Sequence, residues 1–71
     1  MSKVKVAFRY DNDHAFCRSF VCEEENVPKP GMQVRLLVSY GTLVSIEQRG
    51  FTSPEGMKYF VGYVKEDGKN F

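Results

Sequence analysis

The sequence lacks the residue patterns on which most enzymes and metalloproteins depend. It holds one histidine and two cysteines, and it contains no Cys-x-x-Cys spacing, no His-x-x-x-His spacing and no phosphate-binding loop. Zinc sites and nucleophilic sites need such side chains to converge. The sequence therefore predicts a non-enzymatic protein with no metal and no other cofactor.

Long apolar runs and a strong net charge are also missing. Nowhere do about eighteen apolar residues follow one another, and the segment Met1 to Lys5 does not lead into the apolar run of a secretory signal. We therefore expect no membrane span and a cytoplasmic location, where cysteines stay reduced. The formal net charge of +1 argues against a strongly electrostatic nucleic-acid binder, but it allows a local basic face.

Helical periodicity is absent as well, because no segment places apolar residues at helical spacing over about ten positions. The chain instead shows period-two alternation in five stretches that turn residues separate. These stretches predict strands over residues 3–10, 15–23, 32–40, 43–50 and 57–65. We expect one domain over residues 1–71, an all-β, five-stranded antiparallel SH3-like barrel without substantial helix.

The segment 27–41 is the most strongly patterned part of the chain. Two prolines and Gly31 predict a turn. In the apolar strand predicted after it, one face carries Met32, Val34, Leu36, Val38 and Tyr40. Because Leu37 is apolar on the other face, we expect this strand to be the central one. A tight hairpin is predicted at Gly41 and Thr42, and a bulge or a close backbone approach at Gly62.

The same segment resembles a pattern shared by small nucleic-acid-binding barrels. In the N-terminal DNA-binding domain of the primosomal replication-restart helicase, an acidic extended segment is followed by the pattern Val-x-x-Gly-x-x-Val-x-Val-Pro-Phe-Gly and then by a strand rich in Val and Ile. The matching residues here are Val27, Gly31, Val34, Leu36, Tyr40 and Gly41, with Ser39 where that family has proline. The resemblance, which extends to SH3-like and KOW-like modules, implies a small barrel that binds nucleic acid or protein.

That family also carries a Phe-Asp-Tyr segment upstream, which helps to form the pocket for the 3′ end of a nucleic-acid strand. Counting back from Gly31, those places hold Arg18, Ser19 and Phe20 in this chain, so the aspartate and the first aromatic ring are missing. The resemblance therefore implies a fold, and it does not imply recognition of a strand end.

Basic and aromatic residues occur together in the predicted strands. Single-stranded nucleic acid favours this combination, because cations neutralise its phosphates and rings stack on its bases. We predict a face for single-stranded nucleic acid or a partner protein that contains Lys5, Arg9, Tyr10, Arg18, Phe20, Arg35 and Lys58, with Arg49 and Phe60 of the same character. Arg9 and Arg18 lie on adjacent strands of a hairpin, so we expect them to share one face, which Lys3 and Lys5 extend. The alternative is that the rings are core and the cations a solvated surface.

The most reactive side chains belong to His14, Cys17 and Cys22. The spacing of five places the two cysteines on opposite faces of one strand, which separates their sulfur atoms. We therefore expect packed thiols and a turn histidine rather than a metal site or a Cys/His nucleophile.

Two classes of function are compatible with these patterns. The first is a non-enzymatic binding module that engages nucleic acid or a partner protein through one face of the barrel. The second is a small regulator or inhibitor, such as those that bacteriophages encode, which occludes the surface of a host protein. Binding to an oligonucleotide that weakens with salt distinguishes the first from the second. Self-association through an uncovered strand edge is a third possibility, which sedimentation tests.

Overall fold

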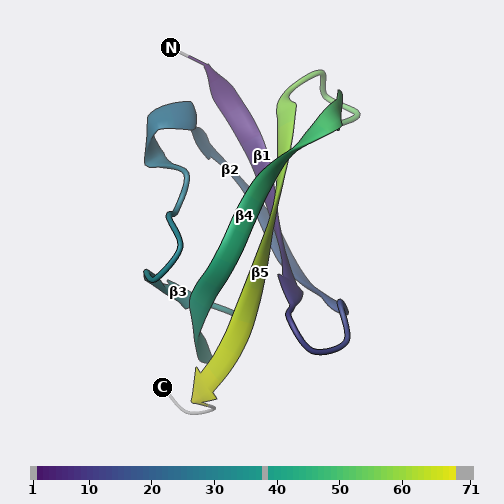
Figure 1. Ribbon diagram of the computed structural model, residues 1–71. Coiled ribbons are helices and arrows are strands. Elements are labelled where there is room, and N and C mark those ends of the chain that lie inside the picture. Colours follow the sequence, from purple (N-terminus) through teal and green to yellow (C-terminus); the bar gives the residue numbers. More distant parts are fainter. Residues whose placement is uncertain (1, 38, 69–71) are drawn as a thin grey trace.

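The computed structural model of the protein describes residues 2–37 and 39–68. Its fold is all-β, and its strands form a single five-stranded sheet (Figure 1). The strands are β1 (Lys3–Tyr10), β2 (Phe16–Glu23), β3 (Gln33–Arg35), β4 (Tyr40–Thr52) and β5 (Lys58–Gly68). A short 3-10 helix, η1 (Glu24–Asn26), follows β2.

The sheet is mixed, so the prediction of a purely antiparallel sheet is wrong. The strand order is β2-β1-β5-β4-β3, and β1 pairs with β5 in parallel, with Val4 opposite Lys58 and Tyr10 opposite Val64. The remaining pairs are antiparallel. Each strand after β1 runs opposite to the strand that precedes it in the chain, so β1 and β5 point the same way. Because β1 and β5 are neighbours in the sheet, they pair in parallel.

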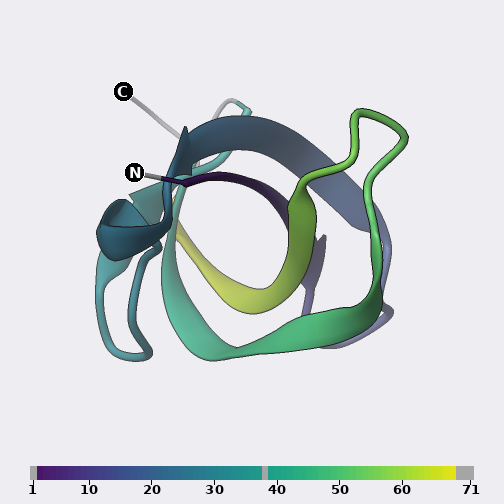
Figure 2. The ribbon, with the colours of Figure 1, turned by 90° about the horizontal axis from the view of Figure 1, so that it is seen from above.

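The sheet coils strongly but does not close into the predicted barrel. Its two ends, β2 and β3, come back toward each other on one side of the molecule (Figure 2). A side chain links them there, since Nη1 of Arg18 donates to the carbonyl oxygen of Arg35 at 3.4 Å. The three residues of β3 follow a segment with two prolines, which lack the N–H that a ladder needs. The sheet is therefore left with two edges.

The segment expected to form the central strand lies at the edge of the sheet. Strand β3 ends at Arg35, and a turn follows in which the Leu36 amide donates to the Ser39 carbonyl at 2.9 Å. Val34 and Leu36 are buried as predicted, whereas Met32 and Leu37 are 50% and 66% exposed. Val38 lies outside the described residues. The apolar run was predicted to be one strand because alternation continues through residues that in fact form a turn.

Strand β5 occupies the centre of the sheet, between β1 and β4, and two glycines permit close contacts between these strands. A Cβ atom at Gly62 would lie 2.8 Å from Cδ1 of Leu43, so side chains fill the space beside Gly62 and the close backbone approach predicted there is not observed. A Cβ atom at Gly41 would lie 2.7 Å from the Lys65 carbonyl oxygen. Gly41 and Thr42 belong to β4, so the hairpin predicted there is wrong. Gly41 serves strand packing rather than a turn.

The core fills the inner, concave face of the coiled sheet. One cluster of buried side chains includes residues from every strand: Val4, Val6, Phe8, Cys17, Val34, Leu36, Leu43 and Val64. The alternation of Val4, Val6 and Phe8 along β1 follows the predicted period of two. Within the described residues, no helix has the length and apolar character needed to span a membrane.

Candidate nucleic-acid interface

A groove lies on the outer face of β1 and β5, on the side of the sheet opposite the core. The parallel register places three pairs of residues side by side on this face: Lys5 with Tyr59, Ala7 with Val61, and Arg9 with Tyr63. In the middle, Ala7 and Val61 are buried, and Ser19 of β2 lies opposite Ala7. Small side chains flanked by long ones leave a hollow, which has a volume of about 600 Å³.

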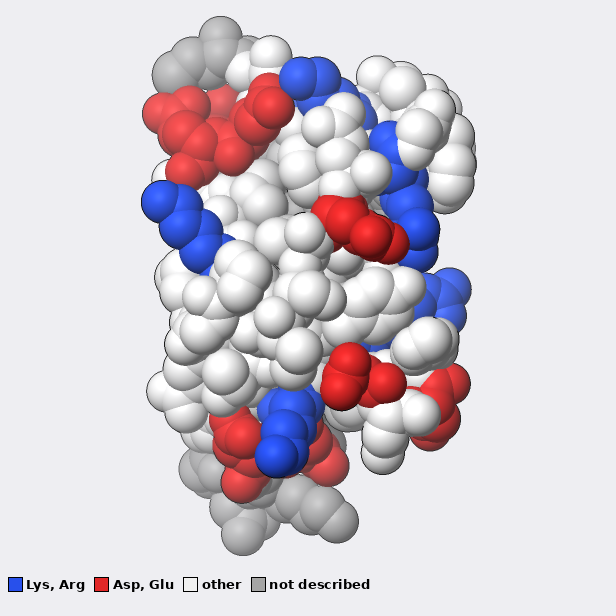
Figure 3. Space-filling model, in the orientation of Figure 1, with Lys and Arg blue, Asp and Glu red and all other residues white. Residues whose placement is uncertain are grey.

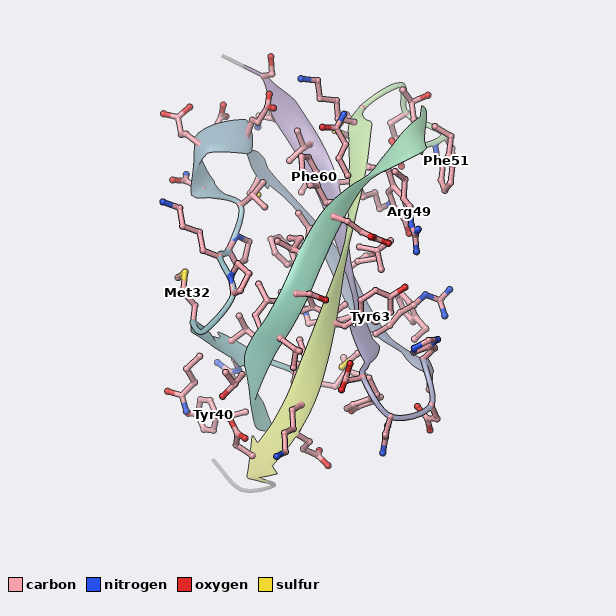
Figure 4. All side chains as sticks on the ribbon, viewed as in Figure 1. Met32, Tyr40, Arg49, Phe51, Phe60 and Tyr63 are labelled. Atoms are coloured by element: carbon pink, nitrogen blue, oxygen red, sulfur yellow. The ribbon has the colours of Figure 1, made fainter. Side chains whose placement is uncertain are left out.

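The last part of β4 forms one wall of this groove. The β4–β5 register breaks between Gln48 and Thr52, and Arg49 and Phe51 lie in the interrupted stretch. Nη2 of Arg49 donates to the Tyr63 hydroxyl at 3.0 Å. Phe51 is 61% exposed, and its ring centre lies 5.4 Å from that of Tyr59. Figure 4 shows Arg49, Phe51 and Tyr63 on the same side of the molecule.

A second pair of rings includes Tyr63, in the middle of β5. The ring centres of His14 and Tyr63 are 5.0 Å apart, and Nη1 of Arg9 donates to the His14 carbonyl at 2.7 Å. His14 has a φ of 59°, and it lies in the β1–β2 turn, where the Ala15 amide donates to Oδ1 of Asp13 at 3.0 Å. Tyr59 and Tyr63 are separated by four positions on β5, or ~13 Å. Aromatic pairs therefore flank the small residues of the groove floor.

Three cations line the groove, namely Lys5, Arg9 and Arg49. Nζ of Lys5 lies 3.6 Å from the Glu55 carboxylate, and Nη1 of Arg49 lies 2.8 Å from that of Glu47. For Arg9, no carboxylate of the described residues is within ion-pair distance. In Figure 3, Lys and Arg side chains gather along the right-hand edge, the side on which Figure 4 labels Arg49. The groove is thus basic, with two of its cations partly neutralised.

The carboxyl group of Glu55 stays charged at the rim of this groove. A hydrogen bond with the Ser53 hydroxyl lowers the pKa of Glu55 below its usual value, and a backbone hydrogen bond and the nearby Lys5 act in the same direction. The turn that carries Glu55 is closed by the Gly56 amide, which donates to the Ser53 carbonyl at 2.8 Å. Glu55 is therefore a fixed negative charge that competes for Lys5.

Of the seven residues predicted to form one binding face, the groove contains Lys5 and Arg9. Arg9 and Arg18 do not share a face, contrary to the prediction. Arg18 pairs with Phe8, whose side chain belongs to the core, while an irregularity between Phe8 and Arg9 shifts the register so that Arg9 pairs with Phe16. One residue of register is enough to send a side chain to the other face.

Tyr10 and Lys58 lie away from the groove. Tyr10 packs against the core, and a hydrogen bond with Cys17, followed by burial, raises the pKa of Tyr10 to about 12. Its hydroxyl therefore stays protonated at physiological pH. Nζ of Lys58 lies 3.2 Å from the Glu24 carboxylate, which ties β5 to η1.

The other predicted residues, Arg18, Phe20 and Arg35, come together at the opening between β2 and β3. Phe20 is half-buried and meets Phe8 edge to face, with ring centres 5.3 Å apart. Phe60 also packs against the core. The structure thus divides the predicted face into two surfaces, the groove and this opening.

Sequence reasoning placed Arg49 among the candidate residues but missed Phe51, Tyr59 and Tyr63. A signal for the two tyrosines was present, since Tyr-x-Val-x-Tyr puts both rings on one face of a strand. That pattern does not say which face is buried. The pairing of β5 with β1 decided it, by aligning Tyr59 and Tyr63 with Lys5 and Arg9.

The two cysteines pack in or beside the core. Cys17 is a buried free thiol and Cys22 a half-buried one, as expected for packed cysteines. Burial, followed by the negative charge of Glu23, raises the pKa of Cys22 above its usual value. Across residues 2–37 and 39–68, no group of three or more His, Cys, Asp and Glu side chains is arranged to hold a metal ion.

No protein-family model, no curated protein and no solved structure matches this chain. The resemblance to the helicase domain and to SH3-like and KOW-like modules therefore stays a prediction. A function has to be inferred from the chemistry of the two surfaces.

Proposed function

We propose that this protein is a non-enzymatic module that binds single-stranded nucleic acid through the outer groove. What supports this function is the convergence of three cations and the Phe51–Tyr59 ring pair around one hollow. The His14–Tyr63 pair lies beside it, where Tyr63 is the neighbour of Arg9 in the sheet. Bases stack on rings and phosphates pair with cations in proteins that bind single strands. A duplex keeps its base faces stacked, so we expect single strands to bind more tightly.

Stacking is expected to contribute more to the affinity than charge does. Two of the three cations already lie 3.6 and 2.8 Å from carboxylates, so few counterions are released when a strand binds. A base stacked on an aromatic side chain contributes ~1–3 kcal/mol. We therefore expect the affinity to fall only weakly as the salt concentration rises, with a slope that corresponds to roughly one to three phosphate contacts.

The test is a titration of labelled oligo-dT, oligo-rU and a duplex with the full chain, followed by fluorescence anisotropy at low and at moderate salt. Phe51→Ala removes an exposed ring of the groove and is expected to weaken single-strand binding roughly tenfold. Phe16→Ala is the matched control, because Phe16 is 56% exposed but does not line the groove. We expect its affinity to equal that of the wild type.

Two results contradict the proposed function. One is an equal loss of affinity in Phe51→Ala and Phe16→Ala, which would mean that binding is nonspecific. The other is the absence of oligonucleotide binding even at low salt. In that case a stoichiometric complex with a protein, captured on the wild-type chain and lost with Phe51→Ala, would favour a small regulator that occludes the surface of its partner.

A further inference from the structure

The opening between the edge strands β2 and β3 is a second surface, termed here the seam. Its lining includes Arg18, Phe20, Pro28, Met32, Val34 and Arg35, and none of the described residues that line it is acidic. Figure 4 places Met32 on one side of the molecule and Arg49 and Phe51 on the other. A ligand in the seam therefore does not compete for space with a ligand in the groove.

Arg18 spans the seam and is held there by weak contacts. Its Nη1 donates to the neutral Arg35 carbonyl at 3.4 Å, which is longer than the usual N–H···O distance of about 2.7–3.2 Å. Its Cζ atom lies 5.4 Å from the centre of the Phe20 ring. No carboxylate of the described residues lies within ion-pair distance of Arg18. A carboxylate binds a guanidinium through two short, charge-assisted hydrogen bonds, so an anionic ligand group would improve on both present contacts.

The seam is also bordered by the edges of two strands. β2 is eight residues long and has β1 as its neighbour in the sheet, so its other side is an edge. Backbone N–H and C=O groups at such an edge pair with an added extended segment. Side chains two residues apart in an extended segment share a face. One segment therefore delivers a carboxylate and an apolar side chain to the same side.

We propose that the seam binds an extended, acidic segment of a partner protein, which adds to the edge of β2. One carboxylate of the segment pairs with Arg18 in place of the Arg35 carbonyl. An apolar side chain two residues away packs on Met32, which is 50% exposed, and on Phe20. The motif is an acidic residue, any residue and then an apolar residue. Nucleic acid fits less well, because Phe20 already meets Phe8 edge to face and offers no open ring for a base.

The experiment uses short random peptides displayed on phage and selected on the full chain. We expect enrichment of Asp or Glu two positions from an aromatic or aliphatic residue. The best peptide is then synthesised and titrated by fluorescence anisotropy. Its affinity should fall roughly tenfold when its acidic residue is replaced by lysine, and by a similar factor with Arg18→Gln, because each change removes the charge-assisted pair. Lys65→Gln, which removes an exposed cation of β5 outside the seam, should change nothing.

The proposal is overturned if the selection does not enrich the acidic motif, or if the acidic and the lysine-substituted peptide bind with equal affinity. It is also overturned if oligo-dT displaces the peptide, or if Arg18→Gln abolishes the binding of oligo-dT. The last result would assign Arg18 to nucleic acid. Circular dichroism checks the fold of Arg18→Gln. If that variant unfolds, Arg18→Lys, which keeps the charge but loses the bidentate fork, and the lysine-substituted peptide still decide the question.

Discussion

The two faces of β1 and β5 differ in the size of their side chains and hence in what they do. On the inner face, Val4, Val6 and Phe8 are fully buried and fill the concave side of the sheet. On the outer face, Ala7 and Val61 are buried too, but they are small and long side chains surround them. Large residues on one face make a core, and small residues on the other leave a hollow. Changes on the inner face should therefore alter stability, and changes on the outer face should alter binding.

The largest expected effect comes from truncating the core. Leu36 is 1% exposed, so Leu36→Ala should lower the free energy of unfolding by about 2–4 kcal/mol, a large share of the stability of so small a domain. Val34→Ala should act in the same direction. The neighbouring Leu37 is 66% exposed, and Leu37→Ala should cost less than about 0.5 kcal/mol. Urea unfolding measures all three, and equal effects of Leu36→Ala and Leu37→Ala would show that the core is wrongly assigned.

A second change tests the close packing between β4 and β5. Gly41→Ala would bring Cβ to 2.7 Å from the Lys65 carbonyl oxygen, a backbone atom that moves only with its strand. We expect a loss of about 1–3 kcal/mol in the free energy of unfolding. Gly50→Ala is the control on the same strand, because no atom lies within 4 Å of the Cβ position there. If the Gly41→Ala variant is as stable as the Gly50→Ala variant, the backbones of β4 and β5 are not in close contact at Gly41.

Filling the hollow should separate binding from stability. Ser19 is exposed and lines the groove, so a bulky ring in Ser19→Trp would occupy the space for a base. Single-strand affinity should fall roughly tenfold, the equivalent of one lost stacking contact, while the free energy of unfolding changes by less than about 0.5 kcal/mol. Ser19→Ala keeps the hollow open and should bind like the wild type. If Ser19→Trp binds oligo-dT as tightly as Ser19→Ala, nucleic acid does not use this groove.

The smallest expected effect is a gain of affinity at the rim of the groove. Glu55→Gln removes the negative charge beside Lys5, so single-strand affinity should rise roughly twofold at low salt and return to the wild-type value at high salt. Because the pKa of Glu55 is held below its usual value, mild acidification of the wild type should not reproduce this gain. Glu25→Gln, an exposed carboxyl on η1, serves as control. A gain of the same size in both variants would indicate a general charge effect.

Much of the local structure was predictable from alternation alone. The first two strands were expected at residues 3–10 and 15–23 and are observed as Lys3–Tyr10 and Phe16–Glu23. The all-β class and the inward face of β1 were also predicted correctly. These features depend on whether one side of a strand is buried. A strand with one buried side shows alternating apolar and polar residues, so the sequence reveals it.

The candidate site was only partly predictable, because its residues belong to strands far apart in the chain. Lys5 and Arg9 were identified, but their alignment with Tyr59 and Tyr63 depends on the parallel pairing of β1 with β5. The separation of Arg18 from Arg9 depends on one irregular position in the β1–β2 register. Neither the parallel pairing nor the irregular position can be recognised from the local composition or from the alternation of apolar and polar residues.

The amino-acid sequence by itself determined the all-β class, the first two strands, the buried face of β1 and the absence of helical periodicity, since each follows from neighbouring side chains. The tertiary structure alone decided that β5 is central and parallel to β1, that β3 is an edge, and that the sheet stays open at the seam. The physical reason is that the alternation of apolar and polar residues in a strand shows that one of its faces is buried. The neighbouring strand and the register of the pairing, in contrast, depend on contacts between residues far apart in the chain. Both proposed surfaces are products of that pairing.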